Sequence, residues 1–135
     1  MTSSASAPIF IIEDDSLMAE CLARAARPAL PATAAVHTFP DAVSATAALA
    51  DCLPCLVILD ILLNGPDGFT FLNEMISYPD THDIPIVIVT SLSLADQDLA
   101  HYGVHAILNK DTMTPAAIQQ AVQAALSAQQ ELTHA

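Results

Sequence analysis

Four apolar runs of this chain end in residues whose types could do chemistry together. Glu13 and Asp14 follow the first run, Asp60 ends the second, Thr90 ends the third, and Lys110 follows the last. Carboxylates that converge on one place repel one another unless a cation lies between them. Because this set offers only oxygen ligands, with no histidine or cysteine among them, it favours a hard divalent ion such as Mg²⁺.

The base and the hydroxyl complete a recognisable kind of site. Lys110 is the only lysine among the 135 residues, and it is expected to face the carboxylates. A phosphoryl group carries spread negative charge, which a metal ion, an ammonium group and hydrogen-bond donors can match. The combination therefore predicts a site that handles a phosphoryl group.

Each of these residues also has a simpler interpretation when it is taken alone. The acids at 13–15 could cap the helix that follows them. Asp60 could be an ordinary loop acid, and Thr90 an ordinary β-branched strand residue. The joint occurrence of the residues at successive strand ends is what favours the chemical interpretation.

Strands and helices alternate along the chain and would position these residues. The apolar runs predict strands at 8–12, 34–39, 55–60, 85–90 and 104–108. Helical spacing predicts helices at about 17–25, at 41–50 with Asp41 as cap, around a core stripe of Phe69, Leu72 and Ile76, at 94–102 with Gly103 as C-cap, and at about 115–130. Strands that are apolar on both faces indicate an α/β fold, a doubly wound five-stranded parallel sheet with five helices. Functional groups of such sheets gather at the carboxyl ends of the strands.

Composition limits the class of protein and its partners. Hydrophobic residues make up 53% and charged residues 13%, which excludes a disordered polymer. A net charge of −12 makes nucleic acid and anionic membranes poor partners. The apolar runs are too short to span a bilayer, and the first residues lack a basic secretory signal. We expect one cytoplasmic domain at 1–135, with its core at about 8–130 and no output domain.

The cysteines and histidines do not suggest a site of their own. Cys52 and Cys55 form a C-L-P-C pair, but it precedes an apolar strand, whereas dithiol redox chemistry needs the pair after a strand, at a helix N-terminus. Together with Cys21 they are interpreted as small buried hydrophobic residues. The five histidines show no ligand spacing and are expected on the surface or in loops.

Several motifs together resemble the receiver domains of response regulators, over about 9–126. I-F-I-I-E-D-D resembles the first strand of that family with its acidic pair. L-V-I-L-D, followed by D-G at 67–68, resembles the phosphoacceptor strand and loop. P-I-V-I-V-T-S and G-V-H-A-I-L-N-K resemble the segments that carry the switch hydroxyl and the lysine. The resemblance implies a flavodoxin-like (βα)5 receiver.

The resemblance also implies a mechanism and partners. Asp60 would take a phosphoryl group from a phosphohistidine of a histidine kinase or histidine phosphotransfer protein. Mg²⁺ would be held by Asp14, Asp60 and the backbone carbonyl of Leu62, with Glu13 acting through water. Lys110 and Thr90 would hold the phosphoryl oxygens, and the altered surface would signal to a downstream protein. Such a domain is an acceptor and not a turnover enzyme.

Three residues depart from the family pattern. Asn64 stands where proline is usual in the loop after Asp60, and Asp111 where proline is common after the lysine. Ile107 replaces the usual switch aromatic, so we expect a smaller activation change at the surface of the last strand and its flanking helices.

Two alternative functions remain open from the sequence. A pseudo-receiver would be an interaction module that is never phosphorylated. A phosphatase similar to the haloacid dehalogenases would also use Asp, Thr and Lys with Mg²⁺. That family carries its nucleophile in a D-x-D at the end of the first strand, and Glu13-Asp14-Asp15 does not match it.

Overall fold

The computed structural model describes residues 7–63, 68–91 and 104–134. In chain order the elements are β1 (Ile9–Ile12), α1 (Ser16–Ala26), the 3-10 helix η1 (Arg27–Ala29), β2 (Val36–Phe39), α2 (Ala42–Leu49), β3 (Leu56–Asp60), α3 (Gly68–Ile76), β4 (Ile86–Thr90), β5 (Val104–Asn109) and α4 (Pro115–His134). All five predicted strands are confirmed within two residues. The helix predicted at 94–102 and its C-cap Gly103 lie outside the described residues.

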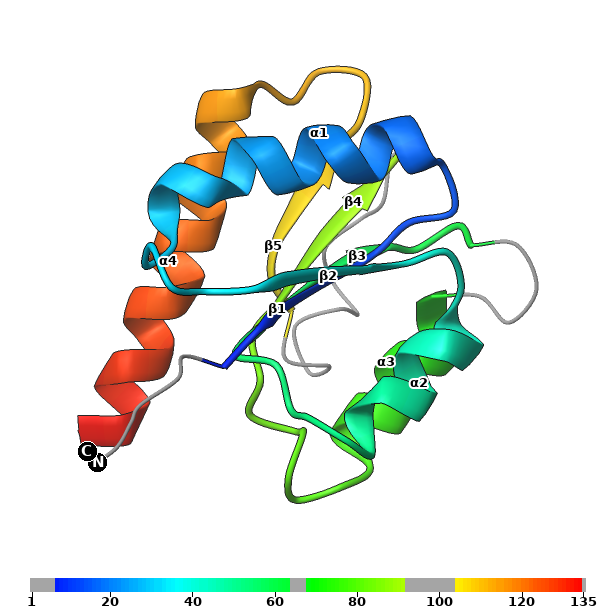
Figure 1. Cartoon of the computed structure of the whole chain (residues 1–135), viewed down its shortest axis with the longest axis vertical. Helices are drawn as coiled ribbons and strands as arrows, with labels where there is room; N and C mark the ends of the chain where they lie inside the picture. Colours follow the sequence, from blue (N-terminus) through cyan, green and yellow to red (C-terminus); the bar gives the residue numbers. More distant parts are fainter. Residues whose placement is uncertain (1–6, 64–67, 92–103, 135) are drawn as a thin grey trace.

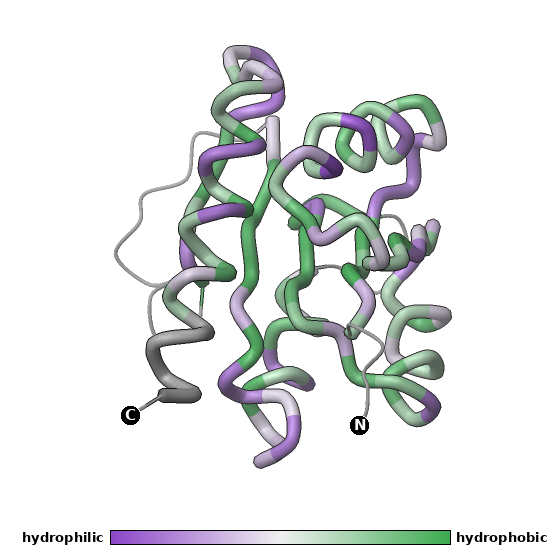
Figure 2. The backbone as a smooth tube through the Cα atoms, turned by 60° about the vertical axis from the view of Figure 1, so that its left-hand side comes forward, coloured by the Kyte–Doolittle hydropathy of each residue, from purple (hydrophilic) through white to green (hydrophobic). Residues whose placement is uncertain are grey.

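The five strands form one parallel sheet in the order β2-β1-β3-β4-β5. The predicted α/β class and the doubly wound parallel sheet are therefore confirmed. Among the described residues, two helices cover each face, α1 and α4 on one side and α2 and α3 on the other (Figure 1). Every residue of β1, β3 and β4 is buried, as expected for strands covered on both faces. These central strands are mostly green in the hydropathy view (Figure 2).

Short polar caps start the first two helices beside the carboxyl edge of the sheet. Asp15 Oδ1 accepts hydrogen bonds from the backbone N–H groups of Leu17 and Met18, at 2.9 and 3.2 Å. Asp41 Oδ1 accepts from Ser44 N–H at 2.8 Å, which confirms Asp41 as the cap of α2. Hydrogen bonding to Ser44 lowers the pKa of the Asp41 carboxyl. The caps satisfy backbone donors that a helix start otherwise leaves without partners.

The predicted core stripe of α3 is confirmed at Leu72 and wrong at Phe69. Phe69 is exposed and Ile76 is half-buried, whereas Phe71, Leu72 and Met75 are buried. The helix begins at Gly68, which packs against the backbone of Ile61. This close start directs the next residue, Phe69, away from the sheet.

The interpretation of the cysteines as buried hydrophobic residues is wrong for two of the three. Cys21 and Cys52 are exposed, Cys55 is half-buried, and all three thiols are free. On α1 the buried positions are Ala19, Leu22 and Ala26, which leaves Cys21 on the outer face. Burial raises the pKa of the Cys55 thiol, which favours its protonated form.

Gly68 is required by the close approach of α3 to the loop after β3. A Cβ at this position would lie 2.6 Å from Ile61 Cα and 2.9 Å from Ile61 O. Because these are backbone atoms, Gly68→Ala should lower the free energy of unfolding by about 1–3 kcal/mol. Urea denaturation measures this, with the exposed Asn73→Ala in the same helix as control. Equal stability of the two variants would contradict the tight contact.

Candidate functional site

Strand register places the chemical residues side by side. Ile12 of β1 pairs with Leu59 of β3, so the next residues along, Glu13 and Asp60, are neighbours at the carboxyl edge. Thr90 of β4 pairs with Asn109 of β5, which puts Lys110 at the same edge. The backbone N–H of Lys110 donates to the carbonyl of Thr90 at 2.8 Å and fixes this position.

Three carboxylates meet at this edge. One oxygen from each of Glu13, Asp14 and Asp60 lies within 4.8 Å of the other two. Glu13 and Asp60 are buried, at 2% and 3% exposure, while Asp14 is more accessible. Buried carboxylates this close need compensating positive charge or protonation. The donor set consists of oxygens alone and fits a hard divalent ion.

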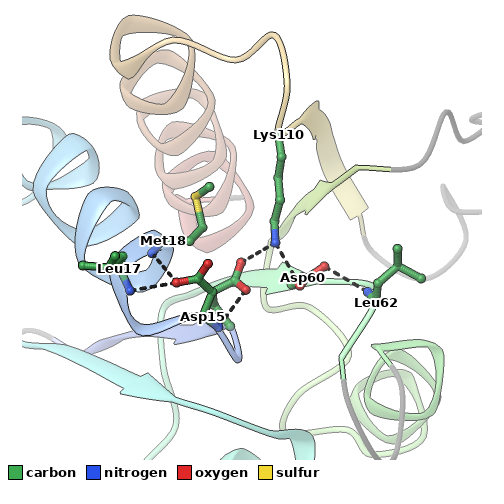
Figure 3. A network of polar contacts seen from close by, with 7 residues as sticks. Asp15, Leu17, Met18, Asp60, Leu62 and Lys110 are labelled. Atoms are coloured by element: carbon green, nitrogen blue, oxygen red, sulfur yellow. Dashed lines mark hydrogen bonds and ion pairs between the residues drawn. The ribbon is translucent and has the colours of Figure 1, made fainter.

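Lys110 supplies positive charge to this cluster. Its Nζ lies 2.7 Å from Glu13 Oε1 and 3.0 Å from Asp60 Oδ2, so one ammonium group bridges two acids. Figure 3 shows the side chain extending from the end of β5 toward Asp60. Only 14% of the Lys110 side chain is exposed, so water screens these ion pairs weakly.

Backbone N–H groups hold the remaining carboxylate oxygens. Leu62 N–H donates to Asp60 Oδ1 at 2.9 Å, so each oxygen of Asp60 has its own donor (Figure 3). Asp15 N–H donates to Glu13 Oε2 at 3.2 Å. The Asp60 carboxylate is therefore oriented before any substrate arrives.

Burial and neighbouring charges shift the pKa values of Glu13 and Lys110. Burial raises the pKa of Glu13 to about 7, against the lowering contacts with Lys110 and Asp15 N–H. Burial alone would lower the pKa of Lys110, but its contacts with Glu13 and Asp60 outweigh that effect and raise it. Lys110 is thus held as an ammonium ion.

The structure brings together the side chains of Glu13, Asp14, Asp60 and Lys110. Thr90 lies at the same edge, where its backbone carbonyl accepts from Lys110 N–H, and the roles of all five residues stay predictions. Thr90 is fully buried at the end of β4. The simple capping interpretation of the acids holds for one of them, since Asp15 alone caps α1. The residues Asn64 and Asp67 lie outside the described residues.

Sequence reasoning missed two contributors to the site. The N–H of Leu62 orients Asp60, and the N–H of Asp15 holds Glu13. The spacing D-S-L-M at 15–18 is a capping signal that could have assigned Asp15 to the helix and left Glu13 and Asp14 to the cluster. Backbone donors such as Leu62 N–H leave no signal in residue types.

The raised pKa of Glu13 predicts a pH dependence of the metal-free fold. Between about pH 4.5 and about 7 the folded Glu13 keeps a proton that the unfolded chain has lost. The unfolded state then binds fewer protons, so stability falls as pH rises, here by about 1–3 kcal/mol. Urea titrations in EDTA at pH 5 and pH 7.5 measure the fall. Glu13→Gln should flatten it, and an equal fall in both proteins would show that Glu13 is not its source.

Comparisons with known proteins agree with this geometry. A family model described as "Response regulator receiver domain" matches residues 9–123. The protein-glutamate methylesterase/protein-glutamine glutaminase 1 of Cereibacter sphaeroides is 36% identical over 93 residues, which are 67% of this chain and 24% of that protein. The chain thus corresponds to about a quarter of that relative.

Solved structures show the same fold. A putative response regulator from Chloroflexus aurantiacus superposes with a TM-score of 0.77 at 26% identity, over 90% of this chain and 98% of that one. The Mn²⁺-bound form of response regulator Rcp1 superposes with a TM-score of 0.70 at 23% identity, over 87% and 90%. The strand register assembles the acids and Lys110, and the family model matches residues 9–123 of the 135. This chain therefore belongs to the response regulator receiver domain family.

Proposed function

We propose that the chain is a phosphoacceptor receiver of a two-component system or phosphorelay, with Asp60 as the acceptor. One observation carries the proposal: the two oxygens of the buried Asp60 carboxylate are held by Lys110 Nζ and Leu62 N–H beside two further acids. This arrangement presents an oriented nucleophile next to fixed positive charge. The donor is a phosphohistidine of a histidine kinase or histidine phosphotransfer protein.

Glu13, Asp14 and Asp60 fit a divalent ion, because their oxygens converge within 4.8 Å and leave net negative charge after pairing with one lysine. We assign Asp14, Asp60 and the Leu62 carbonyl as ligands of Mg²⁺, with Glu13 acting through water. When bound, the ion would neutralise charge on the oxygens of the transferring phosphoryl group. The Mn²⁺-bound form of Rcp1 shows that a protein of this fold holds a divalent ion.

The side chains divide the transfer step between them. An oxygen of Asp60 would form a bond to phosphorus while the P–N bond of the donor phosphohistidine breaks. Lys110 would move from its carboxylate contacts toward the new phosphoryl oxygens, and the Thr90 hydroxyl would donate to another oxygen. These movements at the ends of β4 and β5 would reorder the surface around them and change its contacts with a downstream protein.

The chain would act by protein contact and not by turnover. The glutamate methylesterase relative is about four times as long as the region matched here, so its activity is not assigned to this chain. None of the helices in the described ranges is long and apolar enough to cross a bilayer. The charge of −12 further favours protein partners over nucleic acid or anionic lipid.

The proposal predicts one phosphoryl group per chain. Incubation with acetyl phosphate and Mg²⁺ should add a single phosphate, detected by intact-protein mass spectrometry, because Asp60 is the oriented nucleophile. Asp60→Asn keeps the shape of the side chain and removes the nucleophilic charge, so it should carry no adduct. The exposed Asp51→Asn is the matched control and should react like the parent.

Other outcomes of this incubation would identify other functions. A parent chain that gains no phosphate would instead be a pseudo-receiver, an interaction module. Continuous release of inorganic phosphate without a stable adduct would indicate a phosphatase. An adduct that persists in Asp60→Asn would show that Asp60 is not the acceptor.

The metal assignment predicts stabilisation by Mg²⁺. An ion that binds only the folded state stabilises it by ~2.7 kcal/mol at about one hundred times its dissociation constant. Millimolar Mg²⁺ should therefore raise the melting temperature of the parent, measured by calorimetry, and raise it less in Asp14→Ala. An identical response of both proteins would place the ion elsewhere.

The residues beside the acceptor predict a long-lived phosphorylated state. Leu62 is 47% exposed next to Asp60, and Leu92 holds the corresponding place after Thr90 but lies outside the described residues. Apolar side chains cannot orient an attacking water, and losing ~1.4 kcal/mol of such help slows hydrolysis about tenfold. Leu62→Asn with Leu92→Glu should therefore speed decay of the labelled protein. Unchanged decay would show that these side chains do not control water.

A further inference from the structure

The helix α2 differs from an ordinary surface helix in its composition. Its sequence, A-V-S-A-T-A-A-L, contains no charged residue, although the chain as a whole carries −12. Only Ala42 and Ala45 are buried against the sheet, and Val43 is 62% exposed. A helix that is apolar on all sides is typical of a buried position. Apart from the hydroxyls of Ser44 and Thr46, α2 is apolar, so its outer side lacks the charged side chains that solvent alone would favour.

A groove runs between this helix and α3. Its volume is about 410 Å³, and its lining is almost wholly apolar or uncharged: Ala42, Val43, Thr46, Ala47, Thr70 and Phe71, with Glu74. The buried ring of Phe71 belongs to the core on this side of the sheet. The two helices lie side by side (Figure 1) and belong to the face opposite α1 and α4. The small residues of α2 leave room for a further helix to approach closely.

Glu74 is the one charged residue that lines the groove. It is half-buried, and its carboxylate forms no hydrogen bond or ion pair with any residue in the part of the chain that the structure describes. A carboxylate set among apolar groups gains most from a basic partner that shields it from water.

The chain itself contains few basic residues that could pair with Glu74. It contains three: Arg27 donates to the Ala34 carbonyl, Lys110 bridges the acids of the phosphoacceptor site, and Arg24 pairs with Glu20 on α1. A symmetric contact between two copies would use the same patch on both sides. It would bring two Glu74 carboxylates together without a base, which disfavours a second copy.

We propose that the α2–α3 groove binds an amphipathic helix of another protein, one that inserts an aliphatic side chain beside Val43 and pairs a lysine or arginine with Glu74. An apolar anchor with a flanking base matches both features of the groove, and a helix laid in a groove is a common mode of recognition. The inference goes beyond phosphoryl transfer and does not depend on it, because none of its residues belongs to the phosphoacceptor site.

A synthetic amphipathic helix with leucine on one face and lysine on the other serves as the probe. Amide NMR of the full chain should show shifts concentrated in 42–49 and 68–76. Val43→Glu should weaken binding by about tenfold or more, since it replaces the apolar contact by a charge. Leu17→Glu is the matched control, because Leu17 also is the second residue of its helix, is 74% exposed and gains the same charge. Circular dichroism checks that both variants fold.

The design separates docking from general attraction to an acidic protein. Val43→Glu adds negative charge, so non-specific attraction of a lysine-rich peptide would stay the same or become stronger in this variant. Binding in the groove would become weaker. Glu74→Gln should also weaken binding and should reduce the preference for lysine over glutamate on the polar face of the peptide. Equal binding by Val43→Glu and Leu17→Glu, or shifts centred outside the two helices, would overturn the proposal. A parent chain that sediments as a dimer, with Val43→Glu sedimenting as a monomer, would also overturn the proposal.

Discussion

The ammonium group of Lys110 is the contact on which the site depends. It lies within 3.0 Å of both Glu13 and Asp60, so it joins the ends of β1, β3 and β5 through one side chain. Without it, two buried carboxylates would face each other with only backbone donors as compensation. The chain has no second lysine that could replace it. Because the cluster has three acids and one ammonium group, it keeps a negative charge that a divalent ion could balance.

The parallel sheet makes this contact possible. Its register places Glu13 beside Asp60 and Thr90 beside the residue before Lys110. The strands β1, β3 and β4 are buried along their whole length. Polar groups therefore appear only where these strands end, at the carboxyl edge of the sheet. The core thus serves function by holding four strand ends at fixed spacing.

The strand ends could be predicted from the sequence because they follow continuous apolar runs, whose order and direction set which edge they share. That pattern predicts Glu13, Asp60 and Lys110 at one edge of the sheet. The outward turn of Phe69 could not be predicted, since it depends on the close start of α3 at Gly68 against Ile61. The tighter contact of Lys110 with Glu13 than with Asp60 depends on side-chain geometry, which residue spacing does not specify.

The two surfaces of the molecule would have separate tasks. The carboxyl edge presents buried charge around Asp60, where chemistry on a phosphoryl group is favoured. The groove between α2 and α3 presents apolar surface with Glu74 beside it, where a partner helix is favoured. Signalling by contact needs both kinds of surface, one that receives a modification and others that partners read.

Binding of beryllofluoride, a mimic of the phosphoryl group, tests the central claim most directly. Fluorine NMR of the chain with Mg²⁺ should show bound resonances that disappear when Mg²⁺ is omitted. They should be absent in Asp60→Asn and weakened in Lys110→Met, because the mimic needs the acceptor oxygen, the ion and the ammonium group together. Bound resonances that persist unchanged in both variants would contradict the account.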